Sequence, residues 1–224
     1  MKKELIYRYK KFFTWCLKLY NNYNIKNKIV LRKNKYKIGC SILKNTDINI
    51  YYRNNKIIIG DFCRLINCSI KIYGNNNIIR IEDNCYLKNV EFYIEDDFNK
   101  IVIGEHTSIH GKTHLAAIES TKIEIGKDCM FSNDIHFRTG DSHSIIDESQ
   151  KRINKSENII IGNHVWIGTR VTCLKGTEIK DNSIVGATSL VCKKYTSSNV
   201  IIAGHPARIV KDNINWKRER IKID

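Results

Sequence analysis

No apolar run in the sequence approaches the ~18 uninterrupted residues of a membrane-spanning helix, so we expect no segment that crosses a bilayer. A signal-peptide pattern is also missing, because charged residues interrupt the apolar positions of the first segment, MKKELIYRYKKFF. We therefore expect a cytoplasmic protein in a reducing environment. The chain lacks a recognisable nucleic-acid-binding motif, which argues against a nucleic-acid partner.

Acidic residues are few, since the chain has 23 Asp and Glu against 38 Lys and Arg and a formal net charge of +15. This excess favours an anionic partner, such as a membrane surface or a phosphate-bearing ligand. Ile and Asn are abundant too, as AT-rich coding would produce together with Lys, so charge alone does not identify the partner. The length of 224 residues suits one domain with a full core.

Repeats fill most of the chain. The phrase Ile-x-Ile recurs four times at a step of 22 residues and returns once more near residue 160. The five copies are Ile57/Ile59, Ile79/Ile81, Ile101/Ile103, Ile123/Ile125 and Ile159/Ile161. A fixed period of this length is typical of a solenoid, in which each coil buries its apolar edge against the next coil.

Beyond residue 161 the step of the repeat shortens to six residues. The aliphatic series is Ile161, Ile167, Cys173, Ile179, Val185 and Val191, and glycine follows it at Gly162, Gly168 and Gly186. Three such hexapeptides make a triangular coil of about 18 residues, with aliphatic side chains inward and small residues at the corners. A 22-residue coil is then an 18-residue coil with a polar bulge. The sequence thus predicts an all-β triangular solenoid with coils of both lengths.

Four of the eight cysteines fall at apolar positions of the repeat. Cys63, Cys85 and Cys129 stand four residues after an inward Ile, and Cys173 belongs to the six-residue series. Small hydrophobic residues suit these positions, and stacked strands lie about 4.8 Å apart, slightly beyond a comfortable disulfide geometry. We expect buried free thiols.

One step of the repeat is longer than the others. Ile125 and Ile161 are 36 residues apart, which is one coil plus 18 additional residues. We assign the insertion to a loop over residues 137–158, which carries Asp141 and His143. A long loop on a rigid solenoid is a common location of functional residues.

The two ends do not follow the repeat, so we divide the chain into a helix over residues 1–22, a β-helix over 23–210 and a tail over 211–224. Apolar positions interleaved with Lys and Arg predict a basic amphipathic helix at the start. This helix either packs on the first coil or, through residues 1–20, makes peripheral contact with a membrane such as the inner membrane. The tail, with Trp216 among Lys and Arg, is predicted to be a surface segment or a short helix.

Three segments carry a resemblance to a known family: IIIGNHVWIGTRV at 159–171, IKDNSIVGATSLV at 179–191 and AGHPARIVK at 203–211. With the inserted loop between the coils, they resemble the hexapeptide-repeat acyltransferases, above all the galactoside, maltose and capsular-sugar O-acetyltransferases. The resemblance implies a left-handed parallel β-helix and transfer of an acetyl group from acetyl-CoA to a hydroxyl or an amine. It also implies homotrimers with active sites between subunits.

The resemblance places a catalytic histidine in the inserted loop, where this chain reads TGDSHS, and so identifies His143 as the general base. The chemistry agrees, because histidine titrates near neutral pH and can take the proton of a sugar hydroxyl as that oxygen attacks the thioester. The attack creates an oxyanion that needs a nearby donor. The resemblance assigns this donor to the backbone N–H of Thr169. Asp141 is close in sequence and is our candidate to orient the imidazole.

For CoA, the resemblance points to backbone groups at two residues and to basic side chains for the phosphates. These residues are Gly168, Ala187, Lys193, Arg208 and Lys211. Trp166 could cover the pantetheine arm or the acceptor sugar, or could stack on the coil exterior. The family's usual GAGS reads GATS here, with Thr188 in place of the second glycine.

The remaining histidines differ in their positions. His114 and His136 are 22 residues apart, so they should stack on consecutive coils, where they bind the acceptor together with His110 or bond each other. These three histidines could instead hold zinc, as in the β-helical carbonic anhydrases. We expect no metal, because the motifs of the last coils indicate a transferase. His106 and His164 fall at corners and should have no catalytic role.

The leading hypothesis is an acetyl-CoA-dependent O-acetyltransferase that acts on a sugar hydroxyl of a capsular or surface polysaccharide or of its precursor. An N-acetyltransferase on an amino sugar nucleotide is the nearest alternative and would use the same base. A serine acetyltransferase is disfavoured because the helical domain that precedes the coils in that family is missing. A non-enzymatic membrane-binding scaffold is a further alternative.

Overall fold

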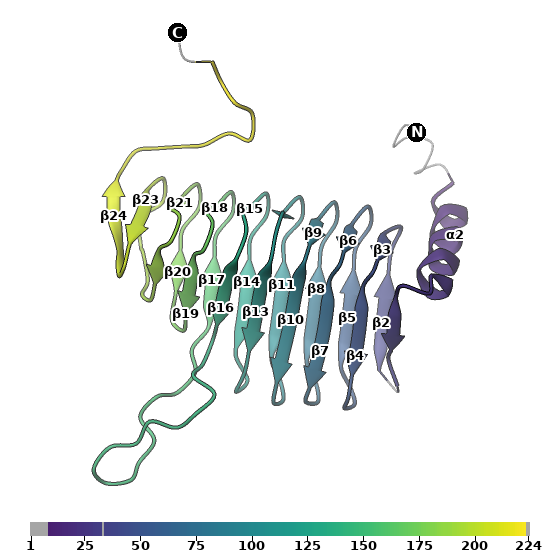
Figure 1. Cartoon of the computed structure of the whole chain (residues 1–224), viewed down its shortest axis with the longest axis horizontal. Coiled ribbons are helices and arrows are strands. Elements are labelled where there is room, and N and C mark those ends of the chain that lie inside the picture. Colours follow the sequence, from purple (N-terminus) through teal and green to yellow (C-terminus); the bar gives the residue numbers. More distant parts are fainter. Residues whose placement is uncertain (1–8, 33, 223–224) are drawn as a thin grey trace.

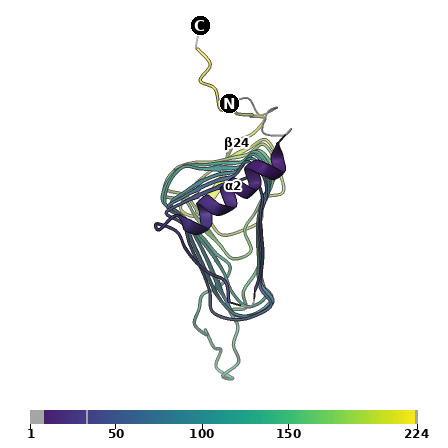
Figure 2. The ribbon, with the colours of Figure 1, turned by 90° about the vertical axis from the view of Figure 1, so that its right-hand side faces the viewer.

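The computed structural model describes residues 9–32 and 34–222 and is a parallel β-helix built from stacked coils (Figure 1). Viewed along its axis, the coils superpose as a triangle (Figure 2). Each coil before the last contributes one strand to each of three sheets, and the winding is left-handed. The prediction of an all-β triangular solenoid is confirmed.

The three sheets are named A, B and C in the order in which the chain meets them. Sheet A contains β1 (Lys28–Val30), β4 (Asp47–Ile50), β7 (Ser69–Tyr73), β10 (Val90–Glu95), β13 (Thr113–Ala117), β16 (Ile135–Arg138), β19 (Thr172–Leu174) and β22 (Leu190–Val191). Sheet B contains β2 (Lys35–Ile38), β5 (Lys56–Ile59), β8 (Ile78–Ile81), β11 (Lys100–Ile103), β14 (Lys122–Ile125), β17 (Ile159–Ile161) and β20 (Glu178–Ile179). Sheet C contains β3 (Ile42–Lys44), β6 (Arg64–Ile66), β9 (Tyr86–Lys88), β12 (Ser108–Ile109), β15 (Met130–Phe131), β18 (Trp166–Ile167), β21 (Ile184–Val185), β23 (Ile201–Gly204) and β24 (Ala207–Lys211).

Strand register follows the repeat. Ile79 pairs with Ile57 and with Ile101, so a step of 22 residues is one full coil. Ile123 pairs with Ile159 across the longer step, which confirms that the additional residues leave the coil as an insertion. Because every pairing in sheet B keeps the same residues inward, a shift by one residue would expose the whole apolar set.

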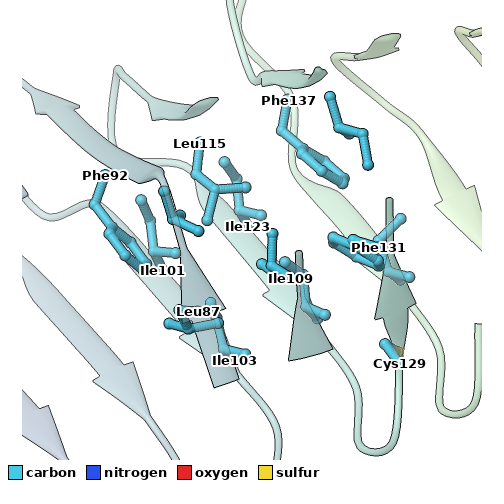
Figure 3. Close-up of a cluster of buried hydrophobic side chains, with 14 of the residues drawn as sticks. Leu87, Phe92, Ile101, Ile103, Ile109, Leu115, Ile123, Cys129, Phe131 and Phe137 are labelled. Carbon is cyan, nitrogen blue, oxygen red and sulfur yellow. The ribbon is translucent and has the colours of Figure 1, made fainter. Parts of the chain in front are cut away.

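Alternate side chains of each strand fill the interior of the triangle (Figure 3). Phe92, Phe131 and Phe137 are the largest completely buried side chains, and the rings of Phe131 and Phe137 stack 5.6 Å apart. The predicted core thiols are buried and free. They are Cys63, Cys85, Cys129 and Cys173. The core is therefore one continuous column.

Three corners join the sheets, and we name them AB, BC and CA after the sheets that they connect. The polar bulges of the 22-residue coils stack at the AB corner. There the side-chain oxygen of Asn55 accepts the Asn77 N–H at 2.8 Å, and Asn77 accepts the Asn99 N–H at 2.6 Å in the same way. Buried asparagines thus satisfy the backbone where the chain leaves the strands.

The inserted loop leaves the AB corner and projects from the bottom of the β-helix in Figure 1. Its predicted start at residue 137 is wrong, because Phe137 is a buried core residue of β16 and pairs with Cys173 and Leu115. The loop begins after Thr139, whose carbonyl accepts the Glu157 N–H at 2.8 Å.

Helix α2 (Lys10–Tyr23) covers the first coil, as Figure 2 shows. The buried side chain of Asn21 donates to the Ser41 carbonyl at 2.9 Å and accepts the Leu43 N–H at 2.9 Å. One face of the helix therefore packs on the first coil, as one of the two predicted alternatives states. Residues 1–8 of the predicted segment lie outside the described part of the chain. Among the described residues, no helix has the length and apolar character needed to cross a bilayer.

The tail contradicts its predicted helix, because residues 212–222 run as an irregular segment after β24. Trp216 is buried, stacks on His164 with ring centroids 4.0 Å apart, and donates its indole N–H to the His164 carbonyl at 2.8 Å. Arg218 binds Asp128 at 2.9 Å and Ser108 at 2.8 Å. The tail is thus a strap across the BC corner.

Candidate active site

The base of the inserted loop is packed into the β-helix. Gly140 is buried between coils, and a Cβ at this position would lie 2.1 Å from the Ser156 hydroxyl and 2.6 Å from Ile118. The Thr139 hydroxyl accepts the Ile118 N–H at 3.0 Å and bonds the Thr121 hydroxyl at 2.6 Å. Only a residue without a side chain fits at the first turn of the loop.

Asn154 organises the interior of the loop. Its amide donates to the His143 carbonyl and to the Asp141 carboxylate, both at 2.8 Å. Its oxygen accepts the Ile145 N–H at 2.8 Å and the Arg152 guanidinium at 3.1 Å. The residue is 6% exposed, so this amide is fully used, and it fixes the backbone at His143 and Ile145 and the side chain of Asp141. Asn154 was missed by sequence reasoning, because no motif marks it.

Two ion pairs tie the loop to the neighbouring coils. Asp141 binds Lys175 of the following coil, and Glu119 of the preceding coil binds Arg152 and the Ser156 hydroxyl. The hydrogen bond from Lys175 holds the pKa of Asp141 below its ordinary value, and that from Arg152 does the same to the pKa of Glu119. The loop therefore has a fixed base while its far end is exposed.

The His143 side chain is exposed on this loop. Among the described residues, no contact joins its imidazole to Asp141, whose carboxylate is engaged by Lys175 and Asn154. The proposed orienting role of Asp141 stays a prediction, and within one chain this residue instead anchors the loop.

The predicted oxyanion and CoA backbone groups gather at the CA corner, at the opposite end of the sheet A strands from the loop. A Cβ on Gly168 would lie 2.8 Å from the Ala187 nitrogen, so the two turns are in close contact. The Thr169 hydroxyl donates to the Asn133 carbonyl at 2.9 Å. The Thr169 N–H has no acceptor among the described residues, which leaves this donor free. Ala187 is exposed beside it.

The three predicted acceptor residues, His110, His114 and His136, lie at or next to the CA corner, at the two turns before the turn of Thr169. His114 and His136 pair across β13 and β16, and their rings lie 6.2 Å apart on the outer face of sheet A. Burial lowers the pKa of His114, so its ring is neutral at neutral pH. His110 is exposed at the CA corner, where its ring lies 5.4 Å from Tyr86.

The zinc alternative finds no support in these positions. His110 contacts an aromatic ring of sheet C, whereas His114 and His136 face outward from sheet A. Nowhere in residues 9–32 and 34–222 do three or more His, Cys, Asp or Glu side chains gather as a group that could hold a metal ion.

Trp166 is 38% exposed on the outer face of sheet C, and its ring lies 6.1 Å from that of Trp216 in the strap. The three predicted phosphate-binding cations are exposed near the last coils: Lys193, Arg208 and Lys211. The Lys193 ammonium lies 5.5 Å from the Tyr195 ring centroid. The predicted site residues therefore fall into two sets, one along the CA corner and the last coils, and one on the loop at the AB corner.

No family model matches the sequence. The chain is 34% identical over 180 residues to a polysialic acid O-acetyltransferase of Neisseria meningitidis, which covers 80% of this chain and 83% of that protein. It is 37% identical over 117 residues to a polysialic acid O-acetyltransferase of Escherichia coli O1:K1, a match that spans 52% of this chain but only 38% of that longer protein. The solved structure of the polysialic acid O-acetyltransferase OatWY superposes with a TM-score of 0.80 at 32% identity, over 87% of this chain and 92% of that one.

Coil architecture, inserted loop and these relatives define the class: a hexapeptide-repeat acyltransferase. The chain belongs to the O-acetyltransferases of this class, whose relatives include polysialic acid, galactoside and lipopolysaccharide or colanic acid enzymes.

Proposed function

We propose that the protein transfers the acetyl group of acetyl-CoA to a hydroxyl of a capsular polysaccharide or of its precursor, with His143 as general base. The observation that carries this proposal is the loop itself, in which a buried asparagine holds the backbone of an exposed histidine on a rigid solenoid. The names of the relatives suggest an acidic polymer of sialic acid as the first acceptor to test. A net charge of +15 suits a polyanion.

In this mechanism the His143 imidazole takes the proton of the acceptor hydroxyl as the oxygen attacks the thioester carbonyl carbon. The carbonyl oxygen becomes an oxyanion, for which the free N–H of Thr169 is the proposed donor. Collapse of the tetrahedral intermediate breaks the carbon–sulfur bond, and the CoA thiolate takes the proton from the imidazolium. The products are the acetyl ester and CoA. Lys193, Arg208 and Lys211 are proposed to bind the CoA phosphates.

This mechanism requires a second copy of the chain. His143 and Thr169 belong to opposite ends of the sheet A strands. A loop that projects away from its own β-helix, as Figure 1 shows, can reach the CA corner of a neighbouring subunit. We therefore include a homotrimer in the proposal, with each site formed by the loop of one subunit and the CA corner of the next.

The test is a comparison of His143→Asn with His106→Asn. Asparagine stays polar at either position but cannot accept the proton, and His106 is an exposed histidine at the BC corner. We expect kcat with acetyl-CoA and polysialic acid to fall by about 10²–10⁴-fold in His143→Asn, with an unchanged Kd for CoA, and to stay at the wild-type value in His106→Asn. Wild-type turnover in His143→Asn would refute the assignment. An amino sugar nucleotide in the same assay tests N-acetylation.

Peripheral membrane contact is also a proposal, and it rests on the outer face of α2. Phe12, Trp15 and Leu19 lie on one side of this helix and are 60%, 58% and 38% exposed, with Lys11 and Lys18 beside them. Such a face suits the interface of an anionic bilayer. After sedimentation with phosphatidylglycerol vesicles, we expect the wild type in the vesicle pellet and Trp15→Ala in the supernatant. Equal recovery of both proteins in the supernatant would refute the proposal.

A further inference from the structure

A continuous row of aromatic rings crosses the outer face of sheet A. Successive ring centroids lie 4.6 Å apart from Tyr51 to Tyr73, 5.6 Å from Tyr73 to Tyr93, 6.0 Å from Tyr93 to His114 and 6.2 Å from His114 to His136. We call these five residues the aromatic row. None of its rings is part of the core, since all five side chains project outward from the sheet.

The two ends of the aromatic row lie at different corners. Tyr51 directly follows β4 and Tyr73 is the last residue of β7, so both lie next to the AB corner of the early coils. His114 and His136 are the second residues of β13 and β16, next to the CA corner. Asn133, whose carbonyl accepts the Thr169 hydroxyl, precedes β16 by two residues. The row therefore leads from the N-terminal coils toward the predicted oxyanion donor.

A cleft of about 400 Å³ opens at the Tyr51 end of the row, and its lining is basic and aromatic. The lining residues are Arg32, Tyr51, Tyr52, Arg53 and Asn75. The Arg32 guanidinium lies 5.8 Å from the Tyr51 ring centroid and donates to the Tyr51 carbonyl at 2.9 Å, which fixes this cation against the row. Two guanidinium groups beside aromatic rings and an amide suit a carboxylate-bearing ring.

Charge along the row favours an anion as well. Arg138 is exposed beside His136, and Lys71 of β7 pairs with Tyr93 of β10. Glu91 is compensated by Lys71, whose ammonium lies 2.8 Å from its carboxylate. Glu95 lies beside Tyr93, 3.5 Å from the phenol oxygen, and Asp134 lies 3.5 Å from the His136 ring nitrogen. The cleft at the Tyr51 end of the row is positive, because its lining, within the described part of the chain, contains Arg32 and Arg53 and no acidic residue.

We propose that the aromatic row and its basic cleft form an extended subsite for an anionic sugar polymer, which holds the chain of the acceptor several residues away from the hydroxyl that is acetylated. This inference rests on the proposed function, because it assigns the acceptor's remote contacts. Flat rings present apolar faces to the carbon–hydrogen faces of sugars, and the arginines bind carboxylates of the polymer. Contacts remote from the reacting group strengthen binding of long acceptors without changing the chemistry.

The experiment measures binding and turnover separately. Fluorescence polarisation with labelled long-chain polysialic acid, without acetyl-CoA, gives the Kd of the full chain. Steady-state assays then compare long polysialic acid with a short sialic acid oligomer as acceptor. The variants are Tyr51→Ala/Tyr73→Ala and Arg53→Ala, with Tyr73→Phe as the conservative control and Tyr20→Ala as a matched exposed tyrosine on α2, 45% exposed against 41% for Tyr51.

We expect the alanine variants to raise the Kd and the KM for the long polymer about tenfold, with kcat, the KM for the short oligomer and the KM for acetyl-CoA unchanged. Tyr73→Phe and Tyr20→Ala should match the wild type. Equal affinity of all variants for the long polymer, or no binding by the wild type, would overturn the subsite. A changed oligomeric mass of Tyr51→Ala/Tyr73→Ala in light scattering would overturn it too, since the row would then be a subunit interface. Binding that depends on the row without acetyl transfer would uphold the subsite and refute the proposed function.

Discussion

At the scale of single residues, the CA corner has a residue with positive φ in most coils, and the sequence supplies residues that adopt it. The corner turn needs a left-handed residue, and Asn45, Asn67 and Asn89 supply it in the early coils with φ of 50°, 54° and 56°. Their amides bond one another along the corner at 3.0 and 3.1 Å. Asparagine tolerates this conformation because its short side chain bonds locally. Thr188 has φ of 59° at the same corner, where a branched side chain is strained.

We predict that Thr188→Asn raises the free energy of unfolding by about 1 kcal/mol, since the branched Cβ is removed from a left-handed turn. The Thr188 side chain is exposed and makes only a local bond to the Ala187 carbonyl, so little packing is lost. Thermal unfolding at fixed protein concentration should show a Tm about 2–4 °C higher. Thr196→Asn, at an exposed position with ordinary backbone, is the control. A lower Tm for Thr188→Asn would contradict the strain argument.

At the scale of elements, the Asn154 amide holds the part of the inserted loop that carries His143. We predict that Asn154→Ala lowers kcat by about 10-fold or more, because the His143 carbonyl and the Ile145 N–H lose their partner and the histidine backbone is released. The KM for acetyl-CoA should not change, since the proposed CoA residues lie at the CA corner and the last coils. Asn158→Ala, at the base of the same loop, removes a different bond, from the Lys122 N–H at 2.9 Å, and should have a smaller effect on kcat. Turnover at the wild-type level in Asn154→Ala would show that another contact fixes the histidine.

The same loop shows what sequence patterns can and cannot predict. The repeat located the insertion because the spacing of apolar residues is visible in the sequence. It could also have given the first residue of the loop more accurately, since Phe137 is 22 residues after Leu115 and pairs with it. Asn154 could not be found in this way. Asn154 holds the loop through four side-chain hydrogen bonds whose partners come together only after the loop folds. In the sequence it is one asparagine in a polar loop, and no neighbouring residue marks it.

The strap is the second element that local patterns could not predict. Trp216 among basic residues fits a surface helix, but the ring is buried against His164, 52 residues away, and Arg218 reaches Ser108, 110 residues away. Long-range contacts of this kind override helix propensity. His164, predicted to have no catalytic role, is therefore a structural anchor of the strap.

At the scale of the whole molecule, one chain holds the predicted catalytic groups on separate corners, so activity should depend on assembly. The loop with His143 leaves the AB corner, and the exposed Ala187 lies at the CA corner. A homotrimer with shared sites predicts that two inactive variants can complement each other. His143→Asn removes the base, and Ala187→Trp places a bulky ring where CoA is proposed to bind.

Each variant alone should be nearly inactive, and loss of CoA binding by Ala187→Trp should be checked first. Co-expressed with different affinity tags and purified through both, the mixed trimers should recover up to about a third of the wild-type activity, because a site needs an intact loop from one subunit and an intact corner from the next, and each mixed trimer has one such site among its three. If base and CoA site belonged to the same chain, every site in the mixture would keep one defect and no activity would return. Recovery thus reports directly whether the loop of one subunit serves the corner of another.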